Sequence, residues 1–408
     1  MTSGTNGPPR RFLALLTRRH VAGAAWWSVV ARLPVYVMSL ALILVVREQG
    51  GGYARAGLVA ALYTLGLAAG GPLVARRVDR HGRRVVLAVT AVVCPASVAV
   101  LVWAARPDGW LQPAAAVLTG VSLPPANAVM RSLWARLPLE EAERDTAFLW
   151  EALLTEVLVI GAPLLLAALM LAGSAGLALT VVSAVGGAGA LGLASVRAPA
   201  ERASANAGRH PLGPLRSPAM AVLLGVMAAC AVPIGLTTLA VPAFVDAHGS
   251  PGGTGAVYAC WGVGSAVGAL WLGRSSSRVP AHRRFPRLVL AYALGAALPL
   301  AATDELTLAA ALAVGGAPIA LVSASEMTLV GRIADSRLLT EAFTWASLAT
   351  VAGDALGQQA GGLLVDRLGP EGVFAVAFGV ALGAAGVAFG CGGLLGRGAG
   401  AVPVGAGR

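Results

Sequence analysis

The sequence predicts an all-α membrane protein in which twelve transmembrane helices form two pseudo-symmetric six-helix bundles. Three observations lead to this prediction: low charge content, long apolar runs and an internal repeat. The chain has 408 residues, of which 57% are hydrophobic and only 12% are charged, whereas soluble proteins carry about 25% charged residues. A net charge of +11 would also fit a nucleic-acid-binding protein. We exclude that class because the arginines lie in short segments between apolar runs.

The apolar runs are long enough to cross a bilayer. A helix of about 20 residues spans the hydrocarbon core, and lipid offers no partner for unpaired backbone groups, so only helices or a closed barrel can cross it. The alternating ten-residue segments of a barrel are missing. The twelve runs lie near 21–46, 53–75, 85–105, 110–135, 147–172, 174–196, 219–245, 254–273, 286–303, 305–329, 342–365 and 371–396.

One long polar segment divides these runs into two sets of six. Residues 197–218 are rich in Pro, Ser, Ala and Arg without apolar periodicity, which predicts a flexible linker. We therefore expect an N-terminal tail at 1–20, bundles at 21–196 and 219–396, and a C-terminal tail at 397–408. A cytoplasmic N-terminus places nearly all arginines on the inside. This predicts cytoplasmic termini in the inner membrane of a bacterium, with anionic lipids at the cytoplasmic face.

The two sets of runs repeat each other. A displacement of 198 residues places three glycines and two arginines on identical residues, namely Gly57, Gly66, Gly70, Arg76 and Arg80 on Gly255, Gly264, Gly268, Arg274 and Arg278. TAFLW at 146–150 matches EAFTW at 341–345 at a displacement of 195. Two parallel six-helix repeats form a transporter architecture in which the substrate path lies between the halves.

The segment GPLVARRVDRHGRR, residues 71–84, places five arginines and an aspartate between two apolar runs. It resembles the signature between the second and third helices of the major facilitator superfamily, which reads roughly G-x-x-x-D-R-x-G-R-R. The resemblance covers about residues 20–396 and implies a secondary transporter that works by alternating access. The first glycine of this pattern, four residues before the aspartate, is replaced here by Ala75. Gly71 matches a longer form of the signature, and the other matching residues are Asp79, Arg80, Gly82, Arg83 and Arg84.

The resemblance also implies a role for Asp79. In the family this aspartate meets the cytoplasmic N-terminus of the eleventh helix, where the helix dipole favours negative charge. Asp79 would then tie the two bundles together on the inside. The residues alone leave two alternatives: Asp79 caps the third helix, or the charges only set the topology. The second half has Ser277 and Pro280 at the corresponding positions, so no such contact is expected there.

Other segments bear on the subfamily. Gly161 and Pro163, in VLVIGAPLLL, resemble a reduced form of the Gly-Pro motif of drug/proton antiporters and favour export. The segment around Arg32, ARLPVYVMSLALILVV, resembles a poorly defined bacterial branch of the superfamily.

Three ionisable residues are expected near mid-membrane. Arg32, Glu156 and Asp354 lie in the first, fifth and eleventh runs, roughly 14–18 Å from the cytoplasmic helix ends at 1.5 Å per residue. Charges inside a span are costly and point to function. We predict that Glu156 or Asp354 takes up a proton whose affinity Arg32 adjusts. The alternative is a static ion pair that fixes helix packing.

The predicted helix that contains Asp354 has a polar face and a glycine-rich packing face. Asp354 and Gln358 share one face and are expected to line a polar cavity. The adjacent face carries glycines at four-residue spacing, suited to close helix packing, at positions Gly353, Gly357 and Gly361. Arg131 and Glu326, at the cytoplasmic ends of the fourth and tenth runs, are predicted either to snorkel to the interface or to form a cytoplasmic gate.

The sequence lacks the patterns of an enzyme. No metal-ligand cluster or nucleophile triad stands out, and a Walker loop is excluded because the chain has no lysine. We therefore expect no metal, no cofactor and no catalysis. The predicted function is secondary active transport of a small molecule by a monomer, with proton-coupled efflux of an amphipathic compound as the best interpretation. A metabolite uptake carrier and a non-transporting membrane sensor or assembly protein are the alternatives.

Overall fold

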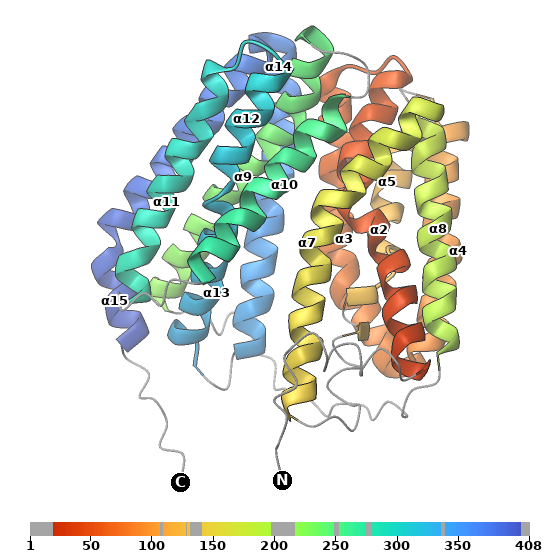
Figure 1. Cartoon of the computed structure of the whole chain (residues 1–408), viewed down its shortest axis with the longest axis horizontal. Helices are drawn as coiled ribbons and strands as arrows, with labels where there is room; N and C mark the ends of the chain where they lie inside the picture. The colour runs from red at the N-terminus through yellow and green to blue at the C-terminus, as the bar shows by residue number, and fades with distance from the viewer. Residues whose placement is uncertain are drawn as a thin grey trace, which may run out of the picture. The chain divides into compact units, whose positions relative to one another are not determined.

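The computed structural model describes residues 19–106, 109–127, 129–130, 141–196, 217–248, 253–273, 280–335 and 339–400. Throughout these ranges the regular elements are helices, and no residue forms a strand (Figure 1). Packing divides the chain into two compact units, which are described separately. The first unit comprises Met1–Val45 and Gly66–Asn206, and the second comprises Val46–Leu65 and Ala207–Arg408.

Most observed helices follow the predicted runs, but the helix in the run 110–135 ends at Val121, and the run 305–329 is divided between two helices. The first six runs correspond to α2 (Arg19–Glu48), α3 (Tyr53–His81), α4 (Arg83–Ala99) with its π-helical extension η1 (Val100–Ala104), α5 (Leu111–Val121), α7 (Glu141–Ala172) and α8 (Ala175–Ser195). The later runs correspond to α9 (Pro218–His248), α10 (Gly253–Gly273), α11 (Ala281–Ala297) with the 3₁₀ turn η3 (Leu298–Ala301), α12 (Glu305–Gly316), α13 (Ile319–Ile333), α14 (Leu339–Gly390) and α15 (Gly392–Gly400).

Helix α14 contains the eleventh predicted run and most of the twelfth. Gly369 interrupts it with a φ of 70°, a conformation that glycine adopts without steric cost, and Pro370 follows directly. Among the described residues, seven helical segments are long and apolar enough to cross a membrane, and the longest, Glu341–Gly390, includes this break. The break explains how one continuous segment provides both the eleventh and the twelfth run.

The predicted duplication is visible in how helices pack. In the first unit, Gly66 and Gly70 of α3 lie against the α5 backbone. In the second unit, Gly264 and Gly268 of α10 lie against the α12 backbone. A Cβ atom on any of these glycines would come too close to a carbonyl oxygen, those of Val117, Val121, Ala313 and Ala317 respectively. The repeated glycines therefore serve the same close helix contact in both units.

The charged segment 71–84, predicted to lie between two membrane-spanning helices, is almost entirely helical. Helix α3 continues to His81, and α4 begins at Arg83, so only Gly82, with a φ of 80°, interrupts the helical backbone. Gly82 occupies the N-cap of α4, whereas the backbone of Asp79 lies in the last turn of α3. The Asp79 side chain lies outside the described residues, so the capping role considered for it stays a prediction.

Candidate functional site

A polar network surrounds Asp354 in α14. The Gln358 side chain donates from Nε2 to Asp354 Oδ2 at 2.9 Å, one helical turn away. Thr64 of α3 donates from Oγ1 to Gln358 Oε1 at 3.1 Å. Gln358 is only 2% exposed, so its amide has a side-chain partner at both ends. The prediction that Asp354 and Gln358 share a face is confirmed, and the network extends to a second helix.

Glycines hold the Asp354 segment close to α9. A Cβ atom at Gly353 or Gly357 would collide with the α9 carbonyls of Ala228 and Val232, and one at Gly361 would press on Leu236 and Leu239. This confirms the predicted packing face of α14. Gly235 of α9 lies against the Asp354 carbonyl in return. The backbone at Asp354 is therefore fixed by close packing on one side.

The same segment also touches α3. Gly57 and Gly362 face each other so closely that a Cβ on either would meet the other's Cα at 3.1 Å. A Cβ at Gly57 would also lie 2.5 Å from the Gln358 carbonyl oxygen. This backbone contact places Thr64, two turns after Gly57, within reach of the Gln358 side chain.

The Asp354 carboxylate has little electrostatic compensation nearby. Within the described ranges, the Gln358 amide is its hydrogen-bond donor and no arginine lies within ion-pair distance. Its helix segment belongs to an apolar stretch long enough to span a membrane. A carboxylate in such a segment is costly when charged.

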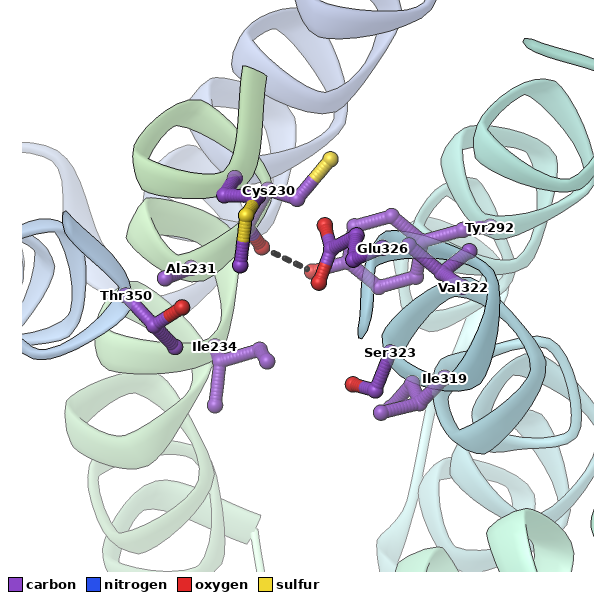
Figure 2. A pocket seen from close by; sticks show the side chains of 10 residues that line it. Cys230, Ala231, Ile234, Tyr292, Ile319, Val322, Ser323, Glu326 and Thr350 are labelled. Atoms are coloured by element: carbon purple, nitrogen blue, oxygen red, sulfur yellow. Dashed lines mark hydrogen bonds between the residues drawn. The ribbon is translucent and has the colours of Figure 1, made fainter. Parts of the chain in front are cut away.

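Glu326 of α13 lies in a second buried site. It is 5% exposed, and its side chain points into a pocket whose walls come from α9, α11, α13 and α14 (Figure 2). Across the pocket, Tyr292 donates its hydroxyl to the Cys230 carbonyl oxygen at 3.0 Å. Glu326 Oε1 has no hydrogen-bond partner among the residues that the structure describes. The snorkelling expected for Glu326 is therefore wrong, because the side chain turns into the bundle.

The size of this pocket limits what it can hold. Its volume is about 30 Å³, which is room for about two water molecules, whereas small-molecule sites measure about 300–1,000 Å³. The remaining lining is mostly apolar and includes Ala231, Ile234, Ile319, Val322, Ser323 and Thr350. In this state the pocket is too small for a transported solute. Arg131, the partner predicted for Glu326, lies outside the described residues, so the gate pair stays a prediction.

The predicted mid-membrane charges are only partly visible. Arg32 is fully buried in α2 of the first unit. The Glu156 side chain lies outside the described residues, although its backbone is part of α7. Because Asp354 belongs to the second unit, a triad of Arg32, Glu156 and Asp354 stays a prediction.

The signature residues have different surroundings. Arg83 is buried, and its Nη2 donates to the Val196 carbonyl oxygen, which fastens the start of α4 to the end of α8. Gly71 and Arg84 are exposed, and the side chains of Asp79 and Arg80 lie outside the described residues. In α7, Pro163 is inside the helix, and Gly161 has open space where a Cβ would stand.

Sequence reasoning missed a cluster at the end of α2 and the start of α3. The Tyr53 hydroxyl donates to Asp246 Oδ2 at 2.5 Å, and the Arg47 guanidinium lies over the Tyr53 ring, 4.1 Å from its centroid. Arg47 Nε is 3.9 Å from Asp246 Oδ2. The Ala54 amide donates to Asp366 Oδ2 at 2.9 Å. Asp246 and Asp366 each directly follow a long apolar run, and this position could have marked them as candidates in the sequence. Their partners lie about 200 and 300 residues away, and the sequence gives no sign of these pairings.

No group of His, Cys, Asp and Glu side chains within the described ranges could hold a metal ion. The candidate sites are instead two groups of polar side chains inside the second unit, the Asp354 network and the Glu326 pocket. Both are suited to bind a proton or a small polar group.

Comparison with known proteins identifies one family. The model of the Major Facilitator Superfamily matches residues 24–298 and 233–392. No curated protein matches the chain.

Several solved transporter structures share the fold. The nucleoside transporter NupG is 12% identical with a TM-score of 0.73, over 90% of this chain and 98% of that one. A bacterial homologue of the iron transporter ferroportin, in an inward-facing state, is 15% identical with a TM-score of 0.67, over 93% and 99%. An auto-inhibited POT family peptide transporter is 13% identical with a TM-score of 0.69, over 93% and 97%. Identities this low show the fold alone. Since the family model covers most of the sequence and the helices follow the same plan, the chain belongs to the major facilitator superfamily and is a multi-pass secondary transporter.

Proposed function

We propose that the chain exports a small amphipathic compound in exchange for protons, and that Asp354 is the proton site. The observation that supports this is the Thr64–Gln358–Asp354 network inside an apolar helix segment. A secondary transporter needs a group that binds the coupling ion in one step and releases it in another. Asp354 is a titratable group in a span with a single amide donor among the described residues.

The network gives protonation a mechanical consequence. A hydrogen bond to a charged carboxylate is roughly twice as strong as one between neutral groups. Proton uptake by Asp354 therefore weakens its bond from Gln358 Nε2. Gln358 also accepts from Thr64 of α3, so the change reaches the helix that ends in the charged segment 71–84. In this way a proton alters how α3 is held against α14.

Arg32 and Glu156 complete the proposal in the first unit. A buried guanidinium favours the charged form of a nearby carboxylate, and Arg32 is fully buried. We assign to it the adjustment of proton affinity at Glu156 or Asp354 during the transport cycle. Export is supported by the Gly161–Pro163 pair of α7. Among the described residues nothing packs where a Gly161 side chain would stand, so packing does not explain this glycine.

The test is solute-triggered proton flux. The purified chain is reconstituted in liposomes with a trapped pH-sensitive dye, a proton gradient is imposed, and amphipathic amines, dyes and neutral metabolites are added one at a time. Solute-dependent proton movement that is lost in Asp354→Asn and kept in Glu371→Gln supports the proposal. Glu371 is a matched control because it is an exposed carboxylate on the same helix.

Three results would contradict the proposal. Uptake of a labelled solute without proton movement would make the chain a uniporter or a carrier coupled to another ion. Proton and solute moving in the same direction would make it an uptake carrier. Flux that continues unchanged in Asp354→Asn would remove this residue from the coupling mechanism.

A further inference from the structure

A basic cavity lies in the second unit where α11 begins beside α15. Its volume is about 520 Å³, within the range of small-molecule sites. Helices α11 and α15 are adjacent in the fold (Figure 1). The charged lining consists of His282, Arg283 and Arg287 from α11 and Arg397 from α15. None of these residues belongs to the Asp354 network or the Glu326 pocket.

The described part of the chain does not balance the positive charge of this cavity. Arg283 and Arg287 are four residues apart, so they project from the same face of α11, and Arg397 faces the cavity from α15. Within the described ranges, no carboxylate pairs with these three arginines. Arg47, by contrast, lies near Asp246. Three guanidinium groups around one open cavity thus leave a place for an anion from outside the chain.

The lining of the cavity combines charged, apolar and open regions. Gly392 and Gly393 have open space where side chains would stand, and a Cβ at Gly396 would be only 3.1 Å from the His282 ring. Glycines therefore keep the floor open between the arginines. Phe389, 50% exposed, forms part of the wall. An apolar ring next to clustered arginines suits a ligand with an anionic head and a hydrocarbon tail.

We propose that this cavity binds the phosphate headgroup of an anionic phospholipid. Arginine binds phosphate through paired N–H donors, and basic pockets between helices at the cytoplasmic face are sites for such headgroups. The predicted orientation places the start of α11 and the C-terminal tail at that face. A soluble phosphate shares the headgroup chemistry, but the exposed Phe389 wall and the membrane location favour the lipid.

The experiment measures lipid binding to the full purified chain. Delipidated protein is titrated with phosphatidylglycerol, phosphatidylcholine or soluble glycerol phosphate, and bound lipid is counted by native mass spectrometry. The Arg283→Gln, Arg287→Gln double variant should bind phosphatidylglycerol about 25-fold more weakly, at about fivefold for each arginine. The Arg77→Gln, Arg332→Gln double variant, which removes the same charge from exposed positions elsewhere, should bind it like the wild type.

A second variant tests the shape without changing charge. Gly393→Leu fills the open floor of the cavity and should also weaken phosphatidylglycerol binding, while its melting temperature in detergent reports whether the fold is intact. Unchanged binding by the cavity double variant, or equal weakening by the control pair, would overturn the site. Equal binding of phosphatidylcholine, or binding of glycerol phosphate that the lipid does not displace, would overturn its assignment to an anionic lipid.

Discussion

Asp354 and Glu326 are carboxylates inside apolar helices of the same unit, yet their surroundings differ. Asp354 receives a hydrogen bond from Gln358, which is bonded in turn to Thr64 on another helix. Glu326 faces a pocket of about 30 Å³ and has one oxygen without a partner among the described residues. Glu326 is buried and Asp354 is partly buried, but of the two only Asp354 is shown connected to a second helix among the described residues.

This difference separates a coupling role from a local one. A change of charge at Asp354 alters a bond chain that joins α14 to α3. A change of charge at Glu326 alters only the contents of a water-sized pocket. We expect substitutions of Asp354 to change transport and substitutions of Glu326 to change stability.

Asp354→Asn should have the largest effect. It keeps the size and polarity of the side chain but cannot exchange a proton, so proton-driven export should fall to the level of empty liposomes. Exchange of solute across the membrane without a gradient should continue, because the path itself is unchanged. Both are measured with labelled solute in proteoliposomes. If proton-driven export persists in Asp354→Asn, the coupling role assigned to Asp354 is wrong.

Gly357→Ala tests whether the backbone contact beside Asp354 matters. The added Cβ would collide with the Val232 carbonyl oxygen, and overpacking of this kind costs about 2 kcal/mol. We expect a lower melting temperature and weaker coupling. Gly383→Ala, on the same helix but with open space at its Cβ, is the matched control and should leave both unchanged. Equal stability of the two variants would contradict the close α9–α14 contact.

Glu326→Met should stabilise the protein. It replaces a buried carboxyl group that lacks a full set of partners, and removing that penalty is worth about 1 kcal/mol. Thermal unfolding in detergent measures the gain, and Glu371→Met, at an exposed carboxylate, should show none. Proton-coupled transport should be retained. A folded Glu326→Met protein that no longer transports would give Glu326 the coupling role instead.

Thr64→Val should produce a smaller, selective loss. It removes the hydroxyl that donates to Gln358 Oε1 while keeping the volume of the side chain. Loss of one such bond is worth about 1 kcal/mol, or about fivefold in rate. Driven export should slow by that factor while solute affinity stays constant, as measured by initial rates over a range of solute concentrations. An unchanged rate would show that the network ends at Gln358.

Asp304 provides an exposed reference for Asp354 and Glu326. It caps α12, and hydrogen bonds from the Thr307 backbone N–H and hydroxyl hold its pKa below the usual range. The cap therefore contributes stability above the ordinary aspartate pKa of about 3.9 and loses it as the pH falls through the lower, folded-state value. Asp304→Asn should show a smaller acid-induced drop in melting temperature than the wild type, with transport unaffected. An identical drop in both proteins would contradict this cap.

The sequence predicted the helices and one face of α14 well. The run at 174–196 became Ala175–Ser195, and the glycine face at Gly353, Gly357 and Gly361 packs as expected. These succeeded because helix length and four-residue spacing depend on the local sequence alone. The continuation of α3 to His81 was missed because the second run was ended at residue 75, where the charged residues begin.

Contacts between distant segments were beyond sequence reasoning. Glu326 was placed at an interface because its distance from the helix end is readable, whereas the rotation of α13 that turns it toward Tyr292 is not. The Thr64–Gln358 bond joins residues 294 positions apart, and it depends on the close approach of Gly57 and Gly362. Spacing along one helix predicts which residues share a face, but not which helix that face meets.

The most direct test counts protons when solute binds. Purified wild-type protein, Asp354→Asn and Glu326→Gln are placed in weakly buffered detergent solution, an exported solute is added, and the pH change is recorded. We predict that the wild type and Glu326→Gln release a proton on binding and that Asp354→Asn releases none. Proton release that survives in Asp354→Asn, or disappears in Glu326→Gln, would contradict the assignment of Asp354 as the coupling site.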